Sequence, residues 1–300
     1  MISMRRIFTL IILCALVAAG AAHAFDLSRL IGGGVQALQA ASVDDAQMAQ
    51  YVHGSVEAMD KKNKVLPSDN PYSIRLARLT SGITDADGIP LNFKVYQTDE
   101  VNAFACPDGS VRVYTGLMDR MTDDEVLGVI GHEIGHVVKR HSLKAFRQQL
   151  LTGAFANMLG STSNTMAALT DSQYAQLGEA FVSAQYSQKQ ESEADDCGYD
   201  FLKAQGRNPW GMVMAFQKIQ ALEGTAGQQS TLAKAFSDHP DTQSRIEHMA
   251  ARCRRDGIQP PRSSGTVEAV GVTQQDIAPR SNSTVENIRN SARTSSQWSF

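Results

Sequence analysis

The sequence has few cysteines, and none of them forms a Cys-x-x-Cys pair. Cys14 lies in an apolar leader, and Cys106, Cys197 and Cys253 are widely separated in the rest of the chain. This spacing argues against a thiolate metal site or a dithiol redox motif. An oxidising compartment would permit one disulfide among the last three cysteines and leave one free thiol, and the sequence does not fix the pair.

The sequence also lacks an excess of positive charge. It contains 28 basic and 31 acidic residues, and removal of the leader, which includes Arg5 and Arg6, leaves 26 basic residues against 31 acidic ones. A protein that binds DNA or RNA neutralises phosphates with a basic surface. The composition therefore argues against nucleic acid as a partner.

Beyond one run near the start, no stretch is long and apolar enough to span a bilayer. That run extends from Ile7 to Ala22, follows the two arginines and ends at Ala22-His23-Ala24, which fits the small-x-small rule for signal-peptidase cleavage. A membrane anchor is the alternative, but the run is short for a spanning helix. We therefore predict a signal peptide at residues 1–24 and export of a soluble protein.

The remaining chain predicts an α+β fold that is mostly helical. Hydrophobic periodicity indicates helices at residues 43–62 and 72–80, and residues 81–90 are rich in turn formers. Three short strands are predicted, around residues 93–96, 101–105 and 111–114, with the last two joined by a turn in a short hairpin or meander. From residue 122 to about 251 the pattern is helical, with five or six helices. A small β-sheet is therefore expected beside the helix that carries the motif described next.

The end of the chain has a different character. Residues 258–300 are rich in Ser, Thr and Asn and contain few large apolar side chains. Such a segment cannot offset its ordering entropy by burial. We predict that it is disordered, and that residues 25–257 form the folded domain.

The segment GHEIGHVVKRH, residues 131–141, contains three histidines and one glutamate. Thr122 and Glu125 form a capping box at the start of a helix whose apolar residues predict burial. On a helix, positions four apart differ by about 40° of rotation, so His132 and His136 project from one face and can bind one ion. Glu133 lies about 100° from His132 and can reach a water rather than the metal.

A pair of hydrogen-bonded core histidines is the alternative interpretation. It would be favoured for one histidine, but His-x-x-x-His with an adjacent glutamate on a capped apolar helix favours a zinc hydrolase. Gly128, Gly131 and Gly135 cluster near the same side, where small residues would let a neighbouring segment approach. His141 lies about 140° from His136 on a continuous helix, so we expect it to be a surface or helix-end residue.

A catalytic zinc takes three protein ligands and keeps one position open. The third ligand is expected in the acidic run ESEAD at residues 191–195, where Glu191 and Asp195 share one helical face. Glu191 would be the ligand, and Asp195 would accept a hydrogen bond from a ligand imidazole, with His132 preferred. Glu193 points elsewhere on this helix. A solvated acidic face is the usual meaning of such a run, and the need for a third ligand outweighs it.

His239 precedes Pro240 in the segment SDHPDTQSRI, which has the features of a helix start. The imidazole could hydrogen-bond an oxyanion in the cleft or take the open position on zinc. From spacing alone, however, a capping histidine without a chemical role is favoured.

Taken together, HEIGH at 132–136, ESEAD at 191–195 and HPDTQSRI at 239–246 resemble metallopeptidase family 48. The segments at 101–119 and 187–202 resemble above all the exported bacterial branch of that family. The resemblance implies a gluzincin-type zinc metallopeptidase domain with one Zn²⁺ per chain. It carries over His132, His136 and Glu191 as ligands and Glu133 as the base, with Asp195 behind the ligands.

The resemblance adds three further expectations. It gives His239 a place at the active site, and it implies that Arg245 anchors the His-Pro segment. It also matches Asn102, Ala103, Phe104 and Ala105 to the family's strand at the cleft, where a substrate backbone would pair by strand addition.

The function predicted from the sequence is that of a zinc endopeptidase of the cell envelope. Its substrates would be unfolded or damaged proteins in the periplasm, with outer-membrane or envelope assembly factors as further candidate partners. The enzyme would be periplasmic, either free or peripheral to the outer membrane. The alternative is a periplasmic chaperone or assembly factor with a gated, weakly active protease site.

Overall fold

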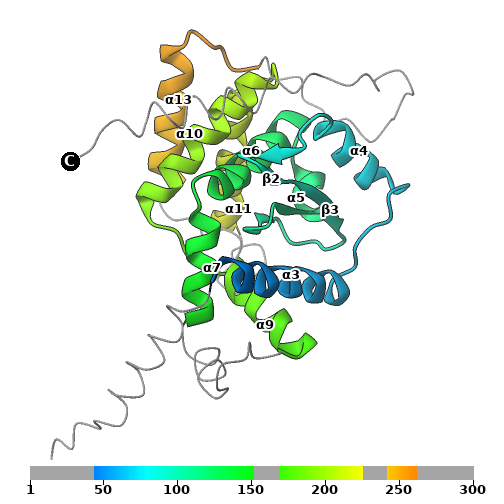
Figure 1. Ribbon diagram of the computed structural model, residues 1–300. Helices are drawn as coiled ribbons and strands as arrows, with labels where there is room; N and C mark the ends of the chain where they lie inside the picture. Colours follow the sequence, from blue (N-terminus) through cyan, green and yellow to red (C-terminus); the bar gives the residue numbers. More distant parts are fainter. Residues whose placement is uncertain (1–43, 152–168, 226–241, 262–300) are drawn as a thin grey trace, which may run out of the picture. The chain divides into compact units, whose positions relative to one another are not determined.

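The computed structural model of the protein describes residues 44–151, 169–225 and 242–261 (Figure 1). All of these except Leu151 belong to one compact unit, Asp44–Leu150 with Ala168–Phe300. Leu151 belongs to the other unit, Met1–Val43 with Leu151–Ala167. The predicted signal peptide, His239 and residues 262–300 of the predicted tail lie outside the described residues.

The central sheet has three strands, β3 (Asn92–Tyr96), β4 (Ala103–Ala105) and β5 (Ser110–Tyr114), in the order β3-β5-β4. Strands β4 and β5 form the predicted antiparallel hairpin. A meander is wrong, because β3 pairs with β5 and runs parallel to it. This pairing sets Val95 beside Val113, and both side chains are buried in the core. Strand β4 is left at the edge of the sheet.

The turn-rich segment before the sheet forms a small hairpin of its own. Strands β1 (Asp85–Ala86) and β2 (Ile89–Pro90) pair antiparallel around Asp87 and Gly88. Both turn residues have positive φ, 53° and 80°. Two left-handed residues in succession match the twist of paired strands, which explains the Asp-Gly sequence.

The two faces of the central sheet differ in chemistry. Val95, Val111, Val113 and the two alanines of β4 point into the main hydrophobic core. On the opposite face, Lys94, Tyr96 and Arg112 donate hydrogen bonds of 2.7 to 3.0 Å to Asp60 of helix α3 (Asp45–Lys62). Arg112 is 1% exposed and Asp60 is partly buried, so this network attaches α3 to the sheet through a partly buried ion pair.

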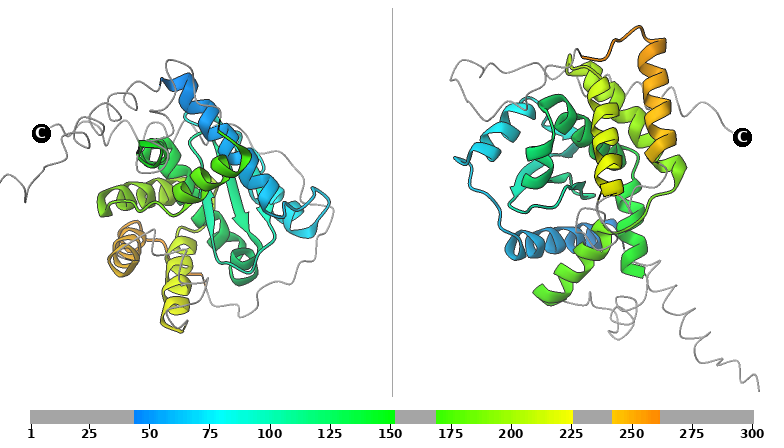
Figure 2. Two further views of the ribbon diagram at one scale, coloured as in Figure 1. Left: turned by 90° about the horizontal axis from the view of Figure 1, so that it is seen from below. Right: turned by 180° about the vertical axis from the view of Figure 1, so that it is seen from behind.

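Two helices precede the sheet, where the sequence predicts them. Helix α3 (Asp45–Lys62) begins at a capping box on Asp44, and α4 (Pro71–Leu79) begins with a proline in its first turn. Helix α9 (Asp171–Val182) packs along α3, and the two are joined by ion pairs from Lys61 to Asp171 and from Lys62 to Glu179 (Figure 2). The short helix α5 (Thr115–Arg120) directly follows β5.

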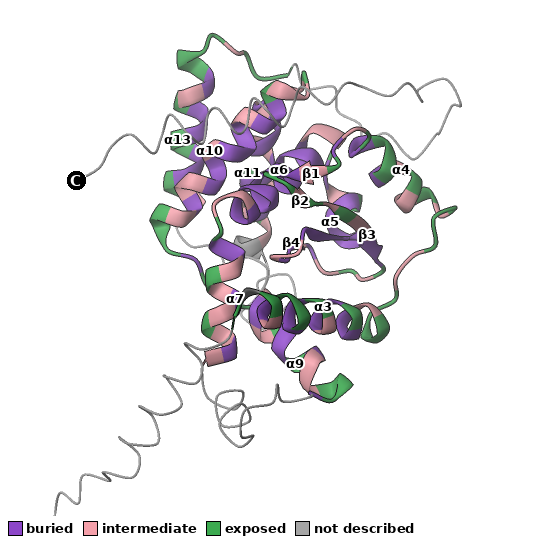
Figure 3. Cartoon of the chain, viewed as in Figure 1, coloured by how far each residue is buried: buried purple, intermediate pink, exposed green. Residues whose placement is uncertain are grey.

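Six helices are described after residue 122, consistent with the predicted number. They are α9 and, in addition, α6 (Asp123–Val138), α7 (His141–Leu151), α10 (Gln188–Ala204), α11 (Trp210–Thr225) and α13 (Thr242–Arg255). Helix α6 begins at the predicted Thr122–Glu125 capping box. It packs between the sheet, α10 and α11 and is buried along nearly its whole length (Figure 3). The prediction of a mostly helical α+β fold with a small sheet beside this helix is confirmed.

Two further expectations concern cysteines and membranes. Cys106, Cys197 and Cys253 are all free and buried, so the single disulfide that the sequence would permit is not formed. Cys106 immediately follows β4, Cys197 lies on α10 and Cys253 lies on α13. Each of them serves as a small buried side chain. Within the described part of the chain, no helix has both the length and the apolar character needed to cross a membrane.

Candidate metal centre

Glycines on α6 and α10 allow these two helices to approach closely. A Cβ atom at Gly135 would lie 2.8 Å from the carbonyl oxygen of Ala194, and one at Gly198 would lie 3.0 Å from the backbone nitrogen of His132. Gly131 likewise faces the Gly198 backbone and the Phe201 ring. The small residues of the motif therefore bring the acidic run of α10 against the histidine face of α6.

This approach gathers His132, His136 and Glu191 around one point. The two Nε2 atoms are 3.1 Å apart, and the carboxylate oxygens of Glu191 lie 3.6 Å from His132 Nε2 and 3.5 Å from His136 Nε2. All three side chains are at most 3% exposed as residues. Three ligands at about 2.0 to 2.1 Å from a tetrahedral ion would be separated by roughly 3.3 Å. The residues present therefore fit one four-coordinate metal ion.

Asp195 sets the orientation of His132. Its Oδ1 lies 2.9 Å from His132 Nδ1, so the imidazole can donate from Nδ1 and direct the lone pair of Nε2 toward His136 and Glu191. Burial raises the pKa of Asp195, but the charge and hydrogen bonds of Arg245 and the contact with His132 outweigh it and lower the pKa to about 2. Asp195 is therefore a carboxylate throughout the neutral range.

Arg245, from the first turns of α13, joins the two carboxylates of α10. Its guanidinium donates to both oxygens of Asp195, at 2.7 and 2.8 Å, and lies 2.8 Å from Glu191 Oε2. It also lies over the ring of Phe216 at 4.4 Å. One buried cation thus partly balances two buried anions. The predicted anchoring of the His-Pro segment by Arg245 involves residues outside those described.

His141 is buried, unlike the surface residue that the sequence suggests, and it begins a second helix instead of ending α6. Helix α6 ends at Val138, and Arg140 has a positive φ of 59° that turns the chain before α7 begins at His141. A projection along one continuous helix therefore fails. The imidazole is 2% exposed, with Nδ1 3.2 Å from His136 Nδ1 and Nε2 3.0 Å from Glu193 Oε2.

These contacts form a hydrogen-bonded chain behind the second histidine. If His136 donates from Nδ1, His141 accepts at Nδ1 and donates from Nε2 to Glu193. Each of the two neutral imidazoles then has one donor and one acceptor nitrogen, as a single tautomer requires. The arrangement mirrors the one that Asp195 gives to His132. Sequence reasoning missed it, because Lys139 and Arg140 are good helix formers and do not signal that the chain turns at Arg140.

Replacement of His141 by Phe is expected to weaken metal binding about 10- to 100-fold, because His136 loses the partner that fixes its tautomer and ring orientation. Competition titration against a chromogenic chelator measures this change. His53→Phe removes an exposed histidine on α3 and serves as the control. An unchanged metal affinity in His141→Phe would show that the chain of hydrogen bonds has no such role.

The side chains that the sequence assigns to the cleft lie near this centre. Glu133 is buried at 6% exposure, next to His132 on α6. The ring of Tyr186, which the sequence did not single out, stacks on His136 with centroids 3.9 Å apart. Strand β4, which contains three of the four residues assigned to substrate, packs against α6. Asn102, the fourth, immediately precedes it.

A His-Glu-x-x-His helix, with a glutamate from a second helix, defines the site of an HExxH metallopeptidase. Comparison with known families agrees, since residues 74–253 match the model described as Peptidase family M48. The chain belongs to this family and is a metalloendopeptidase.

Two relatives from Escherichia coli (strain K12) match over most of both chains. The metalloprotease LoiP is 40% identical over 235 residues, covering 78% of this chain and 91% of the relative. The metalloprotease YcaL is 36% identical over 231 residues, covering 77% and 89%. The beta-barrel assembly-enhancing protease of Yersinia pestis is 34% identical over 139 residues, covering 43% and 28%.

Proposed function

We propose that the protein is a zinc endopeptidase in which His132, His136 and Glu191 hold one Zn²⁺ ion. The convergence of these three buried side chains, with Nε2 atoms 3.1 Å apart, carries the proposal. Two imidazoles and a carboxylate are a donor set that zinc takes at catalytic sites. The buried hydrogen bonds to Asp195 and His141 hold the imidazoles in the geometry that such an ion requires.

The chain's own residues supply the proton transfers of peptide hydrolysis. When bound, zinc acts as a Lewis acid and makes water more acidic. Glu133 takes the proton of the attacking water and delivers it to the leaving amine. Asp195 holds the His132 imidazole in place, and Arg245 holds Asp195. His239 is a candidate donor of a hydrogen bond to the oxyanion. Its alternative roles are capping of a helix or inhibition of the enzyme.

The substrate backbone is proposed to extend along β4. This strand pairs with β5 on one side and, within the described residues, has no strand on the other. The backbone groups of Ala105 point toward that open side, because Asn102 and Cys106 use theirs to pair with β5. Strand addition reads backbone more than side chains, which suits unfolded or damaged proteins as substrates.

We place this activity in the cell envelope, in the periplasm or peripheral to the outer membrane. The predicted signal peptide at residues 1–24 supports export. The similarity to a beta-barrel assembly-enhancing protease supports a role in envelope protein quality control and contact with assembly factors. Separation of periplasmic and membrane fractions tests the location directly, and retention of the protein in the cytoplasm would refute it.

The decisive experiment measures metal content together with cleavage for the purified protein. We expect about one zinc ion per chain, cleavage of an unfolded protein such as reduced, alkylated casein, and loss of both after treatment with a chelator. Stoichiometric zinc should restore cleavage. A matched folded protein that is cut equally fast would contradict the preference for unfolded chains.

The same measurement separates the protease from the alternative chaperone. A chaperone that binds chains without cutting them would suppress aggregation of an unfolded protein and leave it intact, with or without the metal. That result would remove proteolysis of unfolded proteins as the function.

A further inference from the structure

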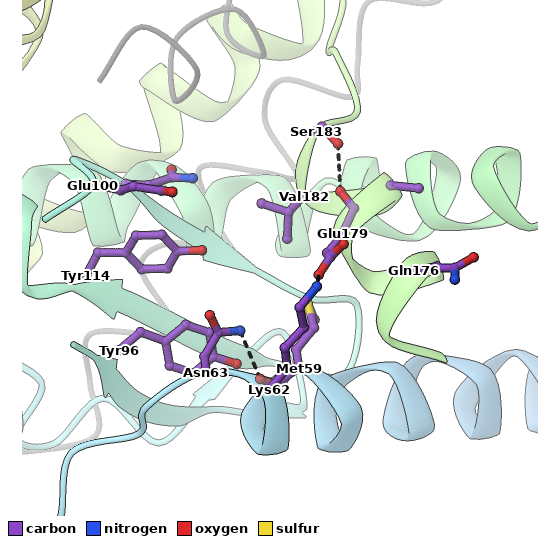
Figure 4. A pocket seen from close by; sticks show the side chains of 12 residues that line it. Met59, Lys62, Asn63, Tyr96, Glu100, Tyr114, Gln176, Glu179, Val182 and Ser183 are labelled. Carbon is purple, nitrogen blue, oxygen red and sulfur yellow. Dashed lines mark hydrogen bonds and ion pairs between the residues drawn. The ribbon is translucent and has the colours of Figure 1, made fainter. Parts of the chain in front are cut away.

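A pocket of about 600 Å³ lies apart from the metal ligands, between α3, α9 and the sheet (Figure 4). Met59 and Lys62 line it from α3, and Glu179 lines it from α9. Asn102 and Tyr114 line it from the β4–β5 side. None of these side chains has a part in the chemistry proposed above, except for the place of Asn102 beside the substrate strand.

The charges in this pocket do not cancel. Lys62 forms an ion pair with Glu179 across the pocket. In contrast, no described residue donates a hydrogen bond to the half-buried carboxylate of Glu100 or forms an ion pair with it. Among the described residues that line the pocket, these three are the only charged ones. The carboxylate of Glu100 is therefore a negative charge at the wall for which the described residues provide no partner.

Aromatic rings form the wall next to this carboxylate. Tyr96 and Tyr114 stack with centroids 5.7 Å apart. The Tyr96 hydroxyl is used by Asp60, but the Tyr114 hydroxyl points into the pocket and has no partner within the described part of the chain (Figure 4). A carboxylate, a phenol oxygen and the faces of aromatic rings together favour a cation with an apolar stem.

Two chain segments place the pocket beside the cleft. Asn102 is the residue before β4, so the pocket lies at the start of the strand that the substrate is proposed to join. Ser183 lines the pocket and is three residues from Tyr186, whose ring stacks on His136. Three residues span at most about 11 Å, so the backbone of Ser183 lies within about 11 Å of the backbone of Tyr186.

The aromatic residues on one face of the sheet support this position of the pocket beside β4. Tyr96, Phe104 and Tyr114 contact one another on the face that α3 covers. In a polypeptide paired with β4, every second side chain points to that face, because strand side chains alternate. A substrate side chain can therefore enter the pocket while the substrate backbone remains paired with the strand.

We propose that this pocket is a specificity subsite that takes a lysine or arginine side chain of the polypeptide substrate. Glu100 pairs with the cation, the Tyr114 hydroxyl accepts from it, and the two tyrosine rings contact its aliphatic stem. An acidic side chain is disfavoured by Glu100, and an apolar one leaves that carboxylate half-buried without a partner. The inference rests on the proposed function, and it names the class of substrate that the site prefers.

A positional scan with internally quenched peptides tests the subsite. Each position in turn is Ala, Lys or Glu, and kcat/KM is measured for the wild-type protein, Glu100→Gln and Glu100→Lys. At one position we expect Lys to be preferred over Ala by about tenfold, as for a hydrogen bond to a charged group. Glu100→Gln should abolish this ratio, and Glu100→Lys should favour Glu at the same position.

The control for long-range charge is Glu57→Lys, an exposed residue of α3 that does not line the pocket. It changes the net charge as Glu100→Lys does, and it should keep the wild-type ratio. A Lys preference that persists in Glu100→Gln, a ratio near one in the wild-type protein, or an equal change in Glu57→Lys would overturn the proposal.

A binding measurement separates failure of the subsite from failure of the proposed activity. The Glu133→Gln variant is titrated with fluorescent Lys, Ala and Glu peptides, and Kd is measured by anisotropy in the presence of zinc. The same Lys preference and its loss on adding Glu100→Gln support the subsite even if the wild-type protein cuts none of the peptides. Equal Kd values for the three peptides refute it even if cleavage is robust.

Discussion

Glu133→Gln is expected to lower kcat for peptide hydrolysis by about 10²- to 10⁴-fold, the usual range for loss of a general base. The amide has nearly the size of the carboxylate but cannot take a proton from water. Glu133 is not among the three converging ligands, so the zinc content should stay near that of the wild-type protein. Single-turnover cleavage of an unfolded protein and metal analysis of the same sample measure the two effects.

The control for this variant is Asp124→Asn, the same loss of charge at the other end of α6. Asp124 pairs with Arg207 and lies nine residues before Glu133, or about 13 Å along the helix axis. Its activity should match the wild-type protein within about twofold, as for most surface substitutions. Purified Glu133→Gln that cleaves at the wild-type rate would remove Glu133 as the base.

Arg245→Met is expected to reduce the free energy of unfolding of the metal-free protein by about 3–5 kcal/mol, as for a broken buried ion pair. The variant keeps an apolar side chain beside Phe216 but leaves Glu191 and Asp195 as two buried anions without their shared cation. Urea unfolding in the presence of a chelator measures the loss. Saturating zinc should narrow the difference from the wild-type protein, because the dication neutralises part of the same charge.

Arg252→Met is the matched control, since Arg252 lies two turns later on the same helix. It also contacts two carboxylates of α10, Asp196 and Asp200, and also lies over an aromatic ring. These carboxylates are 48% and 25% exposed, however, so the loss should be about 0–1 kcal/mol. Equal losses for the two variants would show that burial of the metal-site carboxylates does not decide the cost.

The helical part of the fold could be predicted because its signals are local. The capping box at Thr122 and Glu125 sets the start of α6, and the proline at the start of α4 does the same there. The pairing of β3 with β5 could not be predicted, because strand order depends on contacts between residues distant in the sequence. A hairpin is favoured by its turn, whereas a parallel pair has no local signature.

The metal centre likewise has a part that could be predicted from the sequence and a part that could not. His132, Glu133 and His136 follow from the helical period, and Glu191 with Asp195 follows from the same period on a second helix. The position of His141 depends on Arg140, whose left-handed conformation no helical projection includes. The pocket near Glu100 brings together α3, α9 and the sheet, so no single stretch of sequence indicates it.

By itself, the sequence determined which side chains can share a metal ion, because the spacing within each helix fixes a common face. It also determined that α6 and α10 can approach, through the glycines that they place at the contact. The sequence also predicted the hydrogen bond between Asp195 and His132, whereas only the tertiary structure decided the other contacts that hold the ligands. Arg245, His141 and Glu193 come to the site from three different helices, and such contacts arise when the core packs.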